Sequence, residues 1–127
     1  MTVYEVIDMV KKEKPNKFTS EHMVKWLNEC EAAVQSMLGI PMNEWTKYEA
    51  DDAGDENTSP MLIVPPPYDP LYVYWIKAKI DYANEEYEGY GNNQAQFQSF
   101  FDEFKIWAYN HGMVTGKRLP RSWKNVY

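Results

Sequence analysis

The chain has 127 residues, of which 44% are hydrophobic and 16% aromatic, enough for one domain with its own core. Its single cysteine, Cys30, excludes an internal disulfide, and no apolar stretch approaches the roughly 20 residues that span a bilayer. All 19 acidic residues and nine of the 13 Lys and Arg lie in residues 1–112, for a net charge of −10, whereas residues 113–127 carry +4. Such an acidic body argues against a general phosphate-binding surface, because that needs clustered cations.

The first 40 residues predict two helices. Thr2 and Glu5 form a capping-box pattern ahead of an apolar stripe, so we expect a helix from residue 3 to about residue 12, closed by Pro15. A second helix begins after Thr19, which is a good N-cap, and ends before Gly39, which suits a left-handed C-cap. Cys30 falls on the apolar stripe of that helix, which predicts a buried, reduced thiol.

The segment between residues 40 and 68 is too long to be a structureless loop in a compact domain. We therefore predict two short strands, 44–50 and 60–64, which form a β-hairpin with an acidic tip at residues 51–59. The acids of this tip lack the alternating spacing of an EF-hand loop. A solvated hairpin tip is the favoured interpretation.

The C-terminal half predicts two more helices after a proline-rich stop. Residues 64–67 cannot lie inside a helix, whereas Asp69 followed by Pro70 predicts an N-cap and a first helical turn. The third helix runs from Pro70 to about residue 88, is apolar on more than one face, and is therefore expected to be central. Gly89 and Gly91 are expected to end it.

A fourth helix is predicted from about residue 93 to residue 110, with aromatic residues at helical spacing and Gly112 as its stop. The predicted fold is mainly α: an antiparallel bundle of about four helices in residues 1–112, a small β-hairpin inserted at about 44–64 between the second and third helices, and an extended C-terminal tail at 113–127.

The sequence offers little for catalysis or metal binding. No serine lies in a nucleophile-elbow pattern, and His22 and His111 have no partner at metal-ligand spacing. Asp81 and Asn84 interrupt the apolar third helix, and a structural hydrogen-bonding role is favoured over catalysis for both. We expect no enzyme activity and no cofactor.

The basic tail is the candidate partner-binding segment. A cationic tail on an acidic body suggests docking to an acidic partner, with a merely solvated end as the alternative. Aromatic residues favour docking, because they are costly in a solvated tail. The residues concerned are Lys117, Arg118, Arg121, Trp123, Lys124 and Tyr127.

Three blocks of sequence, spread over about residues 3–110, together resemble the small head–tail connector (adaptor) proteins of bacteriophages and prophages. No block alone is a chemical signature, but their order and spacing are fairly specific. The first is KPNKFTSE (14–21) with WLNECE (26–31), the second is VPPPYDPLY (64–72) with IDYANEEY (80–87), and the third is FQSFFDEF (97–104) with Trp107. Residues 111–127 match no part of the family pattern.

The resemblance implies a structural virion protein that is made in the cytoplasm of the bacterial host. Its subunits would form a ring, commonly of twelve copies, below the portal protein, extending the DNA channel and docking stopper or tail-completion proteins. DNA would pass without specific binding, and no membrane is involved. The family-like residues with structural roles would be Pro15, Phe18, Thr19, Trp26, Leu27, Pro67, Tyr68, Asp69, Tyr72, Asp81, Asn84, Phe104 and Trp107.

Two other functions compete with this one. A small helical adaptor or regulatory module that binds one protein partner one-to-one would have a similar composition. A nucleic-acid-binding factor would depend on the basic tail alone, and its affinity should fall steeply with salt.

Overall fold

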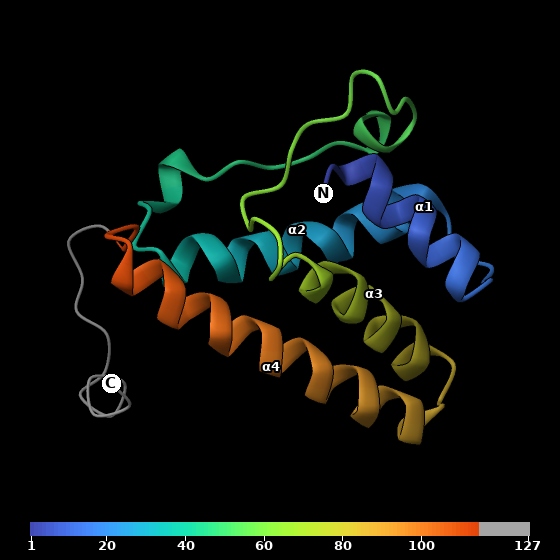
Figure 1. The fold of residues 1–127 in the computed structure, drawn as a ribbon. Helices are drawn as coiled ribbons and strands as arrows, with labels where there is room; N and C mark the ends of the chain where they lie inside the picture. Colours follow the sequence, from blue (N-terminus) through green and yellow to red (C-terminus); the bar gives the residue numbers. More distant parts are fainter. Residues whose placement is uncertain (115–127) are drawn as a thin grey trace.

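The structure, a computed structural model, describes residues 1–114 as four α-helices and two short 3₁₀ helices (Figure 1). The predicted mainly helical fold with four helices is thus confirmed, whereas the predicted tail residues from Lys117 to Tyr127 lie outside the described part. The helices are α1 (Val3–Glu13), α2 (Ser20–Met37), η1 (Met42–Glu44), η2 (Ala50–Ala53), α3 (Pro70–Ala83) and α4 (Tyr87–Asn110). None of the helices in residues 1–114 has the length and apolar character needed to cross a membrane.

The predicted starts of α1 and α2 are confirmed by their caps. The Thr2 hydroxyl accepts from the backbone N–H of Glu5 at 3.1 Å, and the Glu5 carboxylate accepts in return from the backbone N–H of Thr2 at 3.0 Å. Hydrogen bonding of the Glu5 carboxylate to the backbone N–H of Thr2, and to the Thr2 side chain, lowers the pKa of Glu5. Thr19 accepts from the backbone N–H of His22 at 3.1 Å, and Gly39 has a φ of 77°, the left-handed conformation that glycine adopts without strain.

Helix α3 is the centre of the core, as its all-round apolar pattern predicts. Seven of its 14 residues are buried, and it contacts α1, α2 and α4. By contrast, only three of the 24 residues of α4 are buried. Figure 1 shows α4 lying along one side of the other helices, and ten of its residues are exposed and available for contacts outside the domain.

The predicted boundary between the third and fourth helices is wrong. Helix α3 ends at Ala83 and α4 begins at Tyr87, which places Gly89 and Gly91 inside α4 rather than at the end of α3. The turn between them is made at Glu85, which has a φ of 60°. Gly89 has a packing role instead, because a Cβ at that position would lie 2.7 Å from Oδ2 of Asp81.

The predicted β-hairpin is also wrong: residues 1–114 contain no strand, only one isolated bridge between Thr2 and Met61. Side chains of α2 supply the hydrogen bonds that a partner strand would have made. The Asn28 amide donates to the carbonyl of Tyr48 and accepts from its N–H, both at 2.8 Å. Gln35 does the same for Thr46, at 3.1 and 2.6 Å. The extended backbone is thereby satisfied without forming a sheet.

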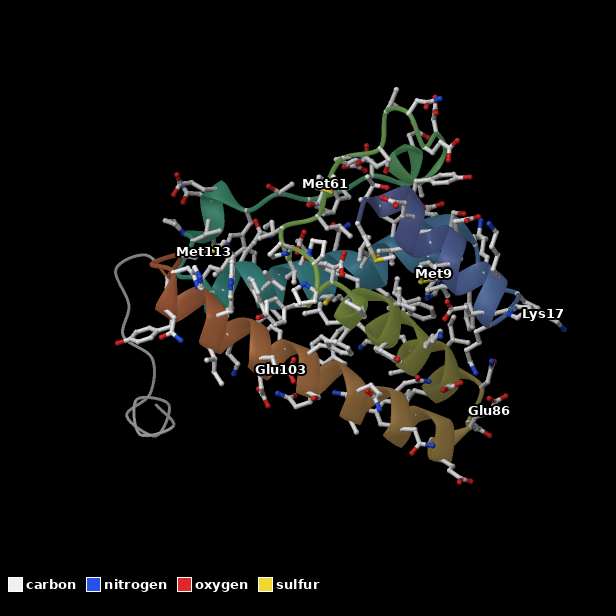
Figure 2. All side chains as sticks on the ribbon, in the orientation of Figure 1. Met9, Lys17, Met61, Glu86, Glu103 and Met113 are labelled. Atoms are coloured by element: carbon white, nitrogen blue, oxygen red, sulfur yellow. The ribbon has the colours of Figure 1, made fainter. Side chains whose placement is uncertain are left out.

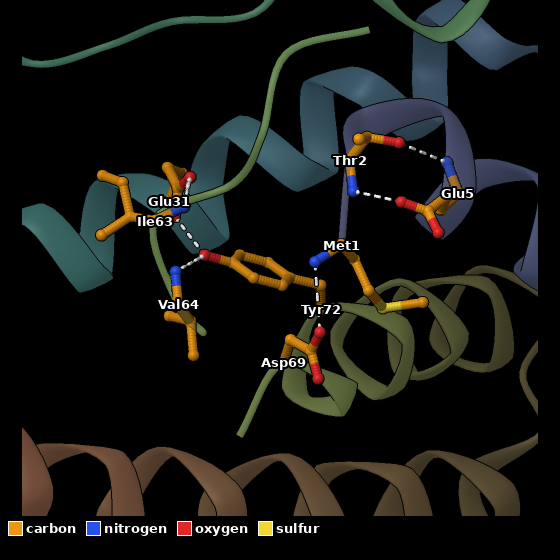
Figure 3. A network of polar contacts seen from close by, with 8 residues as sticks. All are labelled: Met1, Thr2, Glu5, Glu31, Ile63, Val64, Asp69 and Tyr72. Carbon is orange, nitrogen blue, oxygen red and sulfur yellow. Dashed lines mark hydrogen bonds and ion pairs between the residues drawn. The ribbon is translucent and has the colours of Figure 1, made fainter. Parts of the chain in front are cut away.

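Asp69 occupies the predicted N-cap position of α3, but its side chain makes no capping hydrogen bond. Its Oδ2 instead lies 3.1 Å from the amino nitrogen of Met1, which carries the positive charge (Figure 3). Pro70 occupies the first turn of α3 as expected. The carboxylate therefore joins the start of α3 to the start of the chain rather than to the amides of its own helix.

Candidate functional site

Glu31 is the centre of a buried polar network in the middle of α2. Its carboxylate accepts from the hydroxyl of Tyr72 at 2.6 Å, the hydroxyl of Tyr48 at 2.8 Å and the backbone N–H of Ile63 at 3.1 Å. The Tyr72 hydroxyl in turn accepts from the backbone N–H of Val64 at 3.0 Å (Figure 3). The network thus ties two stretches of the segment between α2 and α3 to the two helices that flank it.

The electrostatics of this network are unusual because no Lys or Arg of residues 1–114 forms an ion pair with Glu31. Burial raises the pKa of Glu31, although its three hydrogen bonds act in the opposite direction. Burial and the neighbouring Glu31 carboxylate also raise the pKa values of Tyr72 and Tyr48. The same two causes raise the pKa of the buried Cys30 thiol. Such a fully enclosed carboxylate is suited to holding the fold together rather than to meeting a substrate.

Asp81 is a second buried carboxylate, at the opposite end of α3. It forms an ion pair with Lys14, which follows α1, and accepts from the side-chain amide of Asn93 on α4 at 2.7 Å. Its hydrogen bond to Lys14 raises the pKa of that lysine, against the effect of burial. Asn84 does not share this environment: it is exposed at the C-cap of α3. Asp81 therefore connects α1, α3 and α4, and Asn84 does not.

The family-like residues do not converge on one site. Phe18 and Trp26 lie with His22 in an aromatic cluster at the start of α2, with ring centroids 4.3–5.3 Å apart. Tyr68 packs 6.1 Å from Phe104, near the other end of the domain. The remaining family-like residues are spread between these places: Leu27 and Tyr72 are buried, whereas Pro15, Thr19 and Pro67 are exposed. Part of the set therefore lies in the core and part on the surface.

The sequence analysis missed the role of Glu31. A signal was present, because Leu27, Glu31 and Gln35 follow one another at four-residue spacing and so share one face of a helix. Leu27 belongs to the apolar stripe, so a carboxylate and an amide on the same face indicate buried polar groups that need partners. Nothing in the sequence of α2 identifies those partners.

Four of the five large exposed hydrophobic side chains of residues 1–114 lie in two separate regions, and the fifth, Met9, lies on α1. Met42 and Met61, 75% and 68% exposed, lie on the segment between α2 and α3, and we call them the loop surface. Tyr82 and Tyr87, about 60% exposed, form with Tyr90 an aromatic cluster at the turn between α3 and α4, with centroids 5.3 and 6.1 Å from Tyr82; we call this cluster the corner patch. An exposed aromatic cluster such as the corner patch is typical of an interaction site.

Two of the hollows on the surface of the described residues lie beside α2 and beside α4. A groove of about 740 Å³ lies between α2 and residues 47–50 and is lined by charged groups of both signs. A smaller cleft of about 330 Å³, which we call the end cleft, lies at the C-terminal end of α4. Its lining residues are Tyr68, Glu103, Ile106, Trp107, Asn110 and His111.

Within residues 1–114, no group of three or more His, Cys, Asp or Glu is arranged to hold a metal ion. Comparisons of the chain with protein-family models, curated proteins and solved structures found no match. Its function is therefore inferred from its own sequence and geometry. What the geometry offers is a helical body with exposed apolar surfaces and a cleft.

Proposed function

We propose that this protein is a structural virion protein, a head–tail connector subunit that forms a ring below the portal of a bacteriophage or prophage. The ring extends the DNA channel and docks the stopper or tail-completion proteins. Twelve copies is the number implied by the family resemblance. The subunit performs no catalysis and binds no cofactor.

The observation that carries this proposal is the presence of two different exposed apolar surfaces on opposite sides of one domain. Figure 2 labels Met61 of the loop surface and Glu86 beside the corner patch, and the two lie on opposite sides of the helices. If the loop surface of one copy contacts the corner patch of the next, the contact is heterologous. Contacts of that kind generate closed rings when the rotation between copies closes.

The charge of the chain supports the same proposal. Residues 1–112 carry a net charge of −10. A channel wall that is negatively charged, like DNA, lets DNA slide without binding, because phosphate binding depends on clustered cations. The +4 charge of residues 113–127, together with Trp123 and Tyr127, suits docking to an acidic surface on the portal.

Electron microscopy tests the ring directly. The purified chain is imaged by negative stain alone and mixed with the portal protein encoded beside it. Rings with a central hole, alone or stacked on the portal, are the expected result. Single domains that do not associate with the portal protein would contradict the proposal. They would favour the small adaptor that binds one partner one-to-one.

Paired variants test which surfaces meet. We expect Met42→Lys/Met61→Lys and Tyr82→Lys/Tyr87→Lys each to abolish the ring, because a charge is buried in the contact. The matched control is Met9→Lys on α1, which changes an exposed methionine outside both surfaces. An equimolar mixture of the two double variants should form discrete dimers and nothing larger, since each dimer has one intact contact. Monomers only, or rings from either variant alone, would show that these surfaces do not meet.

A further inference from the structure

The end cleft combines aromatic rings with negative charge. Trp107 stacks on His111 with ring centroids 4.5 Å apart, and the Tyr68 ring lies 6.0 Å from Trp107. Glu103, which is exposed, supplies a carboxylate to the rim. The cleft also lies at the C-terminal end of α4, where the aligned peptide dipoles give a helix a partial negative charge.

These groups are complementary to a cationic side chain. The face of an indole attracts Lys and Arg, and an adjacent carboxylate can accept hydrogen bonds from the same group. An anion would meet Glu103 and the negative helix end, and a purely apolar side chain would leave Glu103 unused. The chemistry of the lining therefore selects lysine or arginine.

The chain itself passes beside this cleft. Gly112 has a φ of 69°, and the backbone N–H of Met113 donates to the carbonyl of Ala108 at 2.9 Å, which turns the chain back at the end of α4. Met113 and Val114 pack against the core. Figure 2 shows Met113 at the same end of α4. Lys117 and Arg118 are the first basic residues after this point in the sequence.

We propose that the end cleft binds the side chain of Lys117 or Arg118 from the same chain. These residues follow Val114 by three and four positions, which allows a reach of roughly 10–13 Å before the length of the side chain is added. A tether this short gives an effective concentration in the millimolar range, which favours the chain's own tail over that of a second copy. This inference does not depend on the formation of a ring.

Nuclear magnetic resonance of the full chain, labelled with ¹⁵N, tests the contact. The reporters are the assigned indole signal of Trp107 and the signals of His111. We expect Lys117→Gln/Arg118→Gln to shift both reporters, and Glu103→Gln to shift them as well. Combining the three substitutions should add little to either change, because both remove the same contact.

Matched controls remove the same charges elsewhere. Lys17→Gln/Lys25→Gln neutralises two exposed lysines of the body, and Glu88→Gln neutralises a carboxylate at the opposite end of α4. Neither should move the reporters. Reporters that do not respond to Lys117→Gln/Arg118→Gln would overturn the proposal. A response that disappears on tenfold dilution would also overturn it, because the cleft would then be occupied by the tail of a second copy.

Discussion

Glu31 and Asp81 are the two carboxylate residues of residues 1–114 that have no exposed surface, and they are stabilised in different ways. Glu31 is held by uncharged donors, namely two tyrosine hydroxyls and one backbone amide. Asp81 is held by the charged Lys14 and by an amide side chain. A buried charge needs either a counter-charge or several good hydrogen bonds, and this chain uses one solution at each end of α3.

The difference follows from what each carboxylate connects. Glu31 holds non-helical backbone, where N–H groups and tyrosine side chains are available as donors. Asp81 lies where helices meet, and the backbone N–H groups within helices are already used, so side chains must supply its partners. Variants at the two sites measure how much each carboxylate contributes to the free energy of unfolding.

The largest effect is expected for Glu31→Ala. Removing the carboxylate leaves the hydroxyls of Tyr72 and Tyr48 and the N–H of Ile63 without their acceptor, and we expect a loss of about 3–5 kcal/mol in the free energy of unfolding. Urea denaturation measures it. The matched control is Glu29→Ala, which removes an exposed carboxylate two positions earlier and should cost less than about 1 kcal/mol. Equal losses in the two variants would show that the network contributes no more than a surface charge.

A smaller loss in the free energy of unfolding is expected for Lys14→Met, which roughly keeps the length of the side chain and removes its charge. Asp81 then keeps only Asn93 as a polar partner, and we expect a cost of about 2–3 kcal/mol, below the usual value for a buried pair because Lys14 is partly exposed. Adding Asp81→Asn to this variant should recover part of the loss, since the unpaired charge is removed as well. If the double variant is less stable than Lys14→Met, the charge of Asp81 is not the cause.

Substitution of the helical glycines separates packing from helix propensity. Gly89→Ala places a methyl group against Asp81 and should cost about 1–2 kcal/mol. A Cβ added at Gly91 would meet no atom within 4 Å. Gly91→Ala should therefore stabilise α4 by about 0.5–1 kcal/mol, because alanine has the higher helix propensity. Thermal unfolding of the two variants measures both effects, and changes of the same sign would contradict the proposed close approach of Asp81.

The smallest expected effect is the dependence of the free energy of unfolding on pH that the titration of Glu31 causes. Because burial raises the pKa of folded Glu31 above its ordinary 4.5, the unfolded chain loses this proton at a lower pH than the folded chain does. This pKa difference stabilises the folded state fully below pH 4.5, and the stabilisation is lost as the pH rises through the raised pKa of folded Glu31. Relative to Glu31→Gln, the wild-type protein should therefore become less stable as the pH rises above 4.5. Parallel stability curves for the two proteins would contradict this, and Glu29→Gln serves as the control.

Local signals in the sequence predicted the helices well. Thr2, Thr19 and Gly39 act within one turn of their own positions, so their roles can be identified without the tertiary structure. Gly89 was misassigned because its role depends on Asp81, eight residues away on another helix. The missing hairpin has a similar cause: the partners of residues 46 and 48 are Gln35 and Asn28 of α2, and no pattern in the loop identifies them.

The same distinction applies to the candidate surfaces. The aromatic content of the corner patch is evident from the sequence, but its exposure depends on where α3 ends and α4 begins, and that boundary was predicted wrongly. The end cleft could not have been predicted, because it combines Tyr68 from the proline-rich segment with residues of α4 that are more than 30 positions away.

The close approach at Gly89 also constrains how this sequence can change in evolution. Because a Cβ at position 89 would collide with the side chain of residue 81, a homologous chain with alanine there needs a shorter or displaced group at position 81. Loss of the carboxylate would in turn remove the reason for a lysine at position 14. Positions 14, 81 and 89 should therefore covary as a triplet, even though they belong to three different segments of the chain.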